Sequence, residues 1–119
     1  MKVLLVQSPR YYWPYVGEGD NHLMPQWMPC LAASIRQAGH EVGVVDCMAS
    51  HIGWKKLADM IREEKPQVIG VGENHCLYAQ EAIKVFQLAK SIDPSIKTVA
   101  GGVHLTNLVE PKLMAYPID

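Results

Sequence analysis

Four short, mostly apolar runs recur along the chain, at residues 2–6, 41–45, 67–71 and 96–100. Each is rich in valine, isoleucine or leucine and lacks the strict alternation of apolar and polar residues that marks a strand with one face in water. Continuous runs of this length are typical of strands whose two faces are both covered. The pattern therefore predicts a buried parallel sheet of four strands.

Between these runs, apolar residues recur at the three- and four-residue spacing of helices. Three helices are predicted at residues 27–38, 54–65 and 79–92, which end at Gly39, before Pro66 and at Asp93. A fourth is predicted to begin with Thr106 or Asn107 as its cap and to run towards Met114. This alternation predicts a flavodoxin-like (Rossmann-like), doubly wound parallel sheet in three α/β/α layers, with right-handed crossovers.

The last residues, 116–119, resemble the lead-in to a fifth strand. We therefore expect residues 1–119 to be one domain of a longer protein, with the fifth strand truncated. An uncovered edge at the fourth strand would favour pairing with a second copy of the chain.

Composition narrows the class of protein. The 119 residues are 49% hydrophobic with a formal net charge of −1, which suits one globular core and gives no electrostatic attraction to nucleic acid or to a membrane surface. No stretch approaches the roughly 18 consecutive apolar residues of a membrane span, and the first apolar run is too short for a signal peptide. The three cysteines are widely separated, which favours reduced thiols and a cytoplasmic location.

Ligands of open parallel sheets bind at the carboxyl ends of the strands, so the loops there are the candidate site. They cover residues 7–25, 46–53, 72–78 and 101–106. The most informative is Gly101-Gly102-Val103-His104, because two glycines permit positive φ and let the backbone approach a ligand closely. The loop at 7–25 carries Tyr11, Tyr12, Trp13 and Tyr15, which either pack on the sheet or stack on a large flat ligand.

Three segments carry a resemblance to a known family: residues 2–10, residues 31–42 with the sequence Leu31-Ala32-Ala33-Ser34-Ile35-Arg36-Gln37-Ala38-Gly39-His40-Glu41-Val42, and the run Asp93 to His104. In this order and spacing the chain resembles the N-terminal cobalamin (vitamin B12)-binding domain of radical S-adenosylmethionine enzymes, of the magnesium-protoporphyrin monomethyl ester anaerobic cyclase and class B methyltransferase types.

The resemblance implies that cobalamin lies over the strand ends, with its dimethylbenzimidazole tail inserted beside the sheet. It also implies a C-terminal catalytic barrel outside this chain, holding S-adenosylmethionine and a 4Fe-4S cluster, so this domain alone would not catalyse. The Asp-x-His-x-x-Gly signature of the methionine synthase and mutase type is absent, since Asp46, His51 and Gly53 have the wrong spacing. We therefore expect no protein histidine on cobalt.

The candidate cofactor-binding residues are Ser8, Pro9, Arg10, Asp46, Gly72, Glu73, Asn74, His75, Gly101, Gly102, Val103 and His104. No catalytic residue and no metal ligand is predicted. Relatives often place serine or threonine after the third strand to contact the tail. This chain has Glu73 there, and Asn74 is the candidate substitute for the hydrogen bond.

Structural alternatives remain for these residues. Gly101 and Gly102 suit any tight strand-to-helix turn, His104 could orient the fourth helix, and Asp46 could cap the next segment. His75 lies beside Cys76, but no second pair at ligand spacing supports a metal. The alternative function is a cofactor-free interaction or regulatory domain of the same fold. A phosphoacceptor receiver lacks its acidic residues here, and neither a nucleophile elbow nor a P-loop motif is present.

Overall fold

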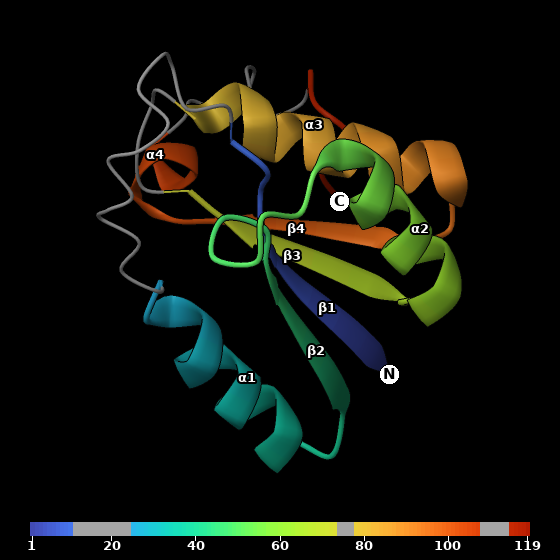
Figure 1. Cartoon of the computed structure of the whole chain (residues 1–119). Coiled ribbons are helices and arrows are strands. Elements are labelled where there is room, and N and C mark those ends of the chain that lie inside the picture. The colour runs from blue at the N-terminus through green and yellow to red at the C-terminus, as the bar shows by residue number, and fades with distance from the viewer. Residues whose placement is uncertain (11–24, 74–77, 108–114) are drawn as a thin grey trace.

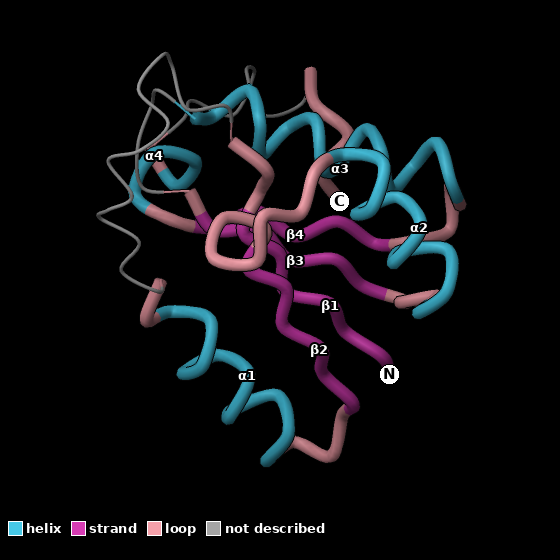
Figure 2. Tube along the Cα trace, viewed as in Figure 1, coloured by secondary structure: helices cyan, strands magenta, loops and turns pink. Residues whose placement is uncertain are grey.

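The computed structural model describes residues 1–10, 25–73, 78–107 and 115–119. The elements along the chain are β1 (Lys2–Gln7), α1 (Trp27–Gln37), β2 (Glu41–Asp46), α2 (Trp54–Glu64), β3 (Val68–Gly72), α3 (Ala79–Ile92), β4 (Lys97–Gly101) and α4 (Val103–Thr106). The four strands form one parallel sheet in the order β2-β1-β3-β4 (Figures 1 and 2). The flavodoxin-like prediction is confirmed, and the strands lie within one residue of their predicted bounds.

Helices cover both faces of the sheet, which explains the continuous apolar strands. Leu4 and Val6 of β1 pack with α2 and α3 in a core whose largest buried side chain is Phe86. Val3 and Leu5, which point to the opposite face, pack against α1. Among the described helices, Figure 1 shows α1 on one side of the sheet and α2 and α3 on the other. Within the described residues, the face covered by α1 is therefore the less completely covered of the two.

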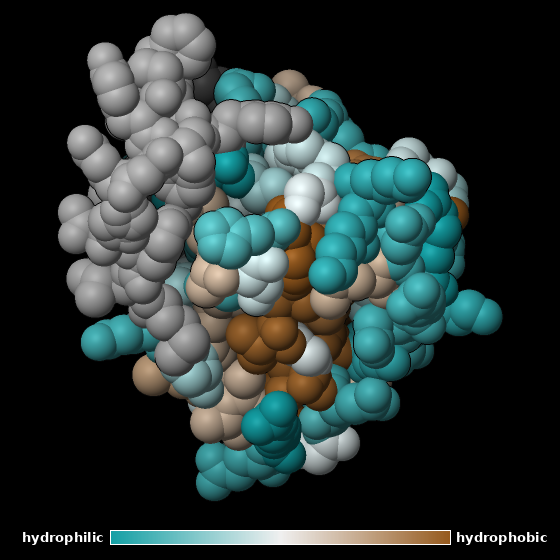
Figure 3. Space-filling model, viewed as in Figure 1, coloured by the Kyte–Doolittle hydropathy of each residue, from teal (hydrophilic) through white to brown (hydrophobic). Residues whose placement is uncertain are grey.

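The edge of the sheet at β2 is partly apolar. Val44 is 42% exposed there, and Figure 3 shows apolar surface over this edge beside the polar surface of α2. None of the described helices is long and apolar enough to cross a membrane.

The last residues of the chain lie beside β4, the other edge strand of the sheet. The backbone N–H of Asp119 donates to the carbonyl of Thr98 in β4 at 3.0 Å, and the N–H of Thr98 donates to the Asp119 carboxylate at 2.9 Å. Ile118 packs against the core formed with α2 and α3. Residues 117–119 therefore lie along the start of β4, while the fifth strand and pairing with a second copy stay predictions.

The fourth helix differs from its prediction. A single helical turn, Val103–Thr106, directly follows Gly102, so helix begins before the predicted cap, and Asn107 follows its last residue. The reason is that Gly102 adopts φ +91°, which turns the chain sharply at the end of β4 and starts the helix there. Residues 108–114, through which the helix was predicted to run, lie outside the described residues.

Candidate functional site

A groove of about 510 Å³ runs between α1 and the carboxyl half of the sheet. Its wall comes from α1 and its floor from β3, β4 and the start of the following turn. The lining residues are Trp27, Cys30, Leu31, Ser34, Gly70, Val71, Gly72, Val99, Ala100, Gly101 and Gly102. Because almost all of these side chains are apolar or absent, the groove suits a flat or apolar group more than a charged one.

Glycines make the floor of this groove. Gly70 pairs with Val99 and Gly72 with Gly101 across β3 and β4. A β-carbon at Gly70 would lie 2.9 Å from Leu5 Cδ2, and one at Gly72 would lie 2.8 Å from the Trp27 ring. Both positions therefore face α1, and the absence of side chains there lets neighbouring groups lie directly on the backbone of β3.

Gly101 and Gly102 are glycines for different reasons. A β-carbon on Gly102 would collide with the backbone of Glu73, within 2.6 Å of its nitrogen, and the φ of +91° also demands glycine. A β-carbon on Gly101 would meet nothing within 4 Å. Gly102 is thus explained by the fold, whereas Gly101 leaves open space in the groove that no packing within the described chain requires.

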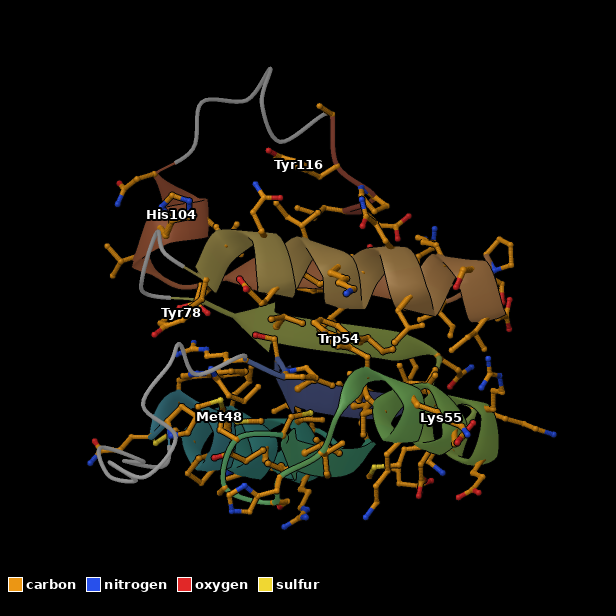
Figure 4. The ribbon with its side chains drawn as sticks, turned by 45° about the horizontal axis from the view of Figure 1, so that its top comes forward. Met48, Trp54, Lys55, Tyr78, His104 and Tyr116 are labelled. Carbon is orange, nitrogen blue, oxygen red and sulfur yellow. The ribbon has the colours of Figure 1, made fainter. Side chains whose placement is uncertain are left out.

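The loops after β3 and β4 are joined through the backbone of Glu73. Its N–H donates to the carbonyl of Gly101 at 3.0 Å, and its carbonyl accepts from the N–H of His104 at 3.3 Å. His104 itself is half-buried on α4. Figure 4 shows His104 and Tyr78 at the same end of the sheet, where the strands finish.

Arg10 and Glu73 form a buried ion pair at this end of the sheet. Nη2 of Arg10 lies 2.6 Å from Oε2 of Glu73, whose side chain is only 1% exposed. The Arg10 guanidinium carbon lies 3.9 Å from the centroid of the Tyr78 ring, close enough for a cation–π contact. Glu73 is therefore neutralised by Arg10, and the sequence contained no local signal for this pair because 63 residues separate its members.

Ser8 and Pro9 follow β1 and are both buried. The hydroxyl oxygen of Ser8 is fully buried and has no hydrogen-bond partner in the described structure. Since buried hydroxyls are nearly always paired, this oxygen is a candidate contact for a bound group.

Asp46 lies apart from the groove. Its carboxylate accepts hydrogen bonds from the N–H groups of Met48 at 2.9 Å and Ala49 at 3.1 Å, so it stabilises the turn after β2. The adjacent Cys47 is buried, and burial together with the nearby Asp46 charge raises the pKa of its thiol to about 12. A smaller cavity of about 210 Å³ lies here between the ends of β1 and β2.

Some predicted site residues cannot be placed. Asn74, His75 and the aromatic residues 11–15 lie outside the described residues. Among the residues that are described, no three histidine, cysteine or acidic side chains come together as a metal site. Conversely, the α1 wall and Gly70 were not predicted. Glycines at 70, 72 and 101 were the available signal, but it needed the β3–β4 register.

Comparisons with known proteins identify a family for the chain. The sequence profile of the family described as "B12 binding domain" matches residues 12–116. The chain is 30% identical over 95 residues to the anaerobic magnesium-protoporphyrin IX monomethyl ester cyclase of Rubrivivax gelatinosus, covering 78% of this chain. It is 28% identical over 83 residues to an uncharacterized methyltransferase of Pyrococcus horikoshii, covering 69% of this chain. Each match spans 17% of the relative's own length. No solved structure matches the chain significantly.

Proposed function

Because this chain belongs to the B12-binding domain family, we propose that it binds cobalamin and that the nucleotide tail of the cofactor occupies the groove between α1 and β3–β4. The observation that carries the proposal is the empty space at Gly101. Nothing in the described chain requires glycine there, yet any side chain would project into the groove.

The groove fits the tail chemically. Dimethylbenzimidazole is flat and largely apolar, and the floor offers it bare backbone at Gly101, where a β-carbon would meet nothing within 4 Å. At Gly70 and Gly72 the side chains of Leu5 and Trp27 already lie against the backbone. Trp27 of α1 supplies an aromatic surface in the wall. The volume of about 510 Å³ is in the range of small-molecule sites.

We propose that the corrin ring lies over the strand ends. Residues of the loops after β1 and β4 would contact it there, namely Ser8, Pro9, Gly102, Val103 and His104, together with Asn74 and His75. The hydroxyl of Ser8, which has no partner within the described part of the chain, would form a hydrogen bond to the cofactor. Since the chain has no Asp-x-His-x-x-Gly sequence, the proposal includes no histidine ligand to cobalt.

The chain spans 17% of the length of the curated relatives it matches, so the whole protein's reaction is a further proposal. The resemblance favours a radical S-adenosylmethionine methyltransferase or cyclase, whose catalytic domain would hold S-adenosylmethionine and a 4Fe-4S cluster. When bound, cobalamin would supply a cobalt centre for group transfer or redox chemistry. This domain's own residues would hold it and orient it towards the catalytic domain.

A cofactor-free interaction domain is the second candidate. One observation favours it: the position after β3, where the family resemblance implies a serine or threonine hydroxyl, holds Glu73, which is already paired with Arg10. The two functions differ in one measurable property, the saturable binding of cobalamin.

The test is a titration of the purified chain with hydroxocobalamin, followed by visible absorbance and calorimetry. We compare the native sequence with Gly101→Leu, which fills the groove. Ala33→Leu is the control, because Ala33 is an exposed residue of α1 that does not line the groove. Binding by the native chain and by Ala33→Leu, but not by Gly101→Leu, supports the proposal. Absence of binding by the native chain favours the interaction domain.

A further inference from the structure

We infer that Arg10 and Glu73 are positioning residues that hold the Gly101–His104 loop in the shape needed to admit the cobalamin tail. The inference rests on the proposed function but concerns residues that act through the backbone, without touching the cofactor. It begins from the burial of the pair: the side chain of Glu73 is 1% exposed and that of Arg10 is 13% exposed.

Glu73 contacts the loop after β4 through its backbone. Two backbone hydrogen bonds join Glu73 to Gly101 and His104, and the backbone of Glu73 lies directly against Gly102. A shift of the Glu73 backbone should therefore also move Gly101 and Gly102, which form part of the groove floor.

Arg10 holds the side chain of Glu73 in place. Its carboxylate is held at 2.6 Å by Arg10, which follows β1, and Arg10 in turn packs on Tyr78 at the start of α3. The pair thus ties together the segments that follow β1, β3 and β4. These are the three segments from which the cofactor contacts are proposed.

The presence of an ion pair at this buried position calls for a reason beyond stability. Replacing a buried ion pair by apolar residues of similar volume is often neutral or stabilising, whereas removing one partner leaves an uncompensated buried charge. Stability alone therefore gives little reason for Arg10 and Glu73. A directional bond between them does fix the Glu73 backbone, and this is the role that we assign to it.

The experiment compares two ligands, cobalamin and cobinamide, which has the corrin ring but lacks the nucleotide tail. The test variant is Arg10→Met/Glu73→Leu, which removes the bond and leaves no unpaired charge. Glu73→Gln is a second, less drastic variant. The control is Arg62→Gln, which removes an exposed ion pair of 2.8 Å with Asp59. Both residues belong to α2, which does not line the groove. Calorimetry gives the dissociation constants, and thermal unfolding establishes that each variant is folded.

We expect the dissociation constant of cobalamin to rise about tenfold in the double variant, a loss of about 1.4 kcal/mol, because the loop loses its support. The rise should be smaller in Glu73→Gln, whose amide oxygen can still accept from Arg10. The dissociation constant of cobinamide should rise clearly less than that of cobalamin, since cobinamide keeps the corrin contacts of the loop but has no tail to place in the groove. Equal loss of affinity for both ligands, or no loss for either, overturns the inference.

A second readout needs no cofactor. Amide hydrogen exchange at His104 and Glu73 should accelerate in the double variant and stay unchanged in Arg62→Gln. If the native chain binds no cobalamin, the proposed function fails, and the exchange rates then decide the role of the pair. Unchanged exchange at both amides overturns the positioning role of Arg10 and Glu73.

Discussion

The α-carbon of Gly102 lies directly against the backbone of Glu73, so that a β-carbon there would come within 2.6 Å of the Glu73 nitrogen. The φ of Gly102 is +91°, which side-chain-bearing residues rarely adopt. The neighbouring Gly101 has neither restriction. Two adjacent glycines of one motif therefore have separable roles, one in the fold and one in the groove.

This difference predicts opposite effects of alanine on stability. Gly102→Ala should lower the free energy of unfolding by about 2 kcal/mol or more, because both backbone strain and a collision with main chain must be relieved. Gly101→Ala should change it by less than about 1 kcal/mol. Urea unfolding followed by circular dichroism measures both. Equal destabilisation by the two substitutions would contradict the separation of roles.

Ser8 and Thr98 provide a matched pair of buried hydroxyls. Both residues are 0% exposed, but the Thr98 hydroxyl donates to the carbonyl of Pro117 at 2.7 Å, whereas the Ser8 hydroxyl has no partner among the residues that the structure describes. Ser8→Ala should therefore leave stability unchanged or raise it by up to about 1 kcal/mol, while Thr98→Val should lower it by about 1 kcal/mol. Denaturant unfolding of the ligand-free chain makes the comparison.

The same Ser8→Ala variant separates structure from function. If the Ser8 hydroxyl contacts the cofactor, its removal should weaken cobalamin binding several-fold without loss of stability. A variant that is both less stable and unchanged in binding would show that the hydroxyl serves the fold instead.

The sequence predicted most of the architecture because the relevant signals are local. Continuous apolar runs defined the four strands, and Gly39 marked the end of the first helix, where the chain adopts φ +82°. The position of the Gly101–His104 motif followed from the strand that precedes it. The predicted start of the fourth helix was wrong because Gly102 adopts a positive φ and lies against the Glu73 backbone, a contact that its neighbours in sequence do not reveal.

The groove could not be predicted in the same way. Gly72 and Gly101 lie side by side only because of the register between β3 and β4, and Trp27 reaches Gly72 from a helix 45 positions earlier. The Arg10–Glu73 pair likewise depends on the neighbouring positions of β1 and β3 in the sheet. Such contacts follow from strand order and register, which local periodicity does not specify.

Asp119 predicts a dependence of stability on pH. Its pKa lies well below the usual value, chiefly because of the ion pair with Lys90 and then the hydrogen bond from the N–H of Thr98. A carboxylate whose pKa is lowered by folding stabilises the native state above its unfolded pKa of about 3.9, and this stabilisation is lost as the pH falls. Asp119→Asn should therefore be less stable than the native chain at pH 7.

The difference in stability between the native chain and Asp119→Asn should narrow as the pH falls below about 4, because the carboxylate of Asp119 then begins to lose its stabilising effect. Urea midpoints at pH 7 and pH 3 measure it. Asp59→Asn is the control, since Asp59 belongs to an exposed ion pair within one helix and should have little effect at either pH. A gap of equal size at both pH values would contradict the assignment.

The reactivity of Cys30 should report whether the groove is occupied. Cys30 is exposed and lines the groove, whereas Cys47 is buried with its pKa raised to about 12. In a Cys76→Ser background, a thiol reagent at pH 8 should modify Cys30 rapidly and Cys47 only on unfolding, because the thiolate is the reactive form. Bound cobalamin should slow modification of Cys30 in proportion to the occupancy measured by absorbance. Cobinamide, which has no tail, should leave the rate unchanged. Mass spectrometry of the labelled chain follows both sites, and protection of Cys30 by both ligands alike would place the tail outside the groove.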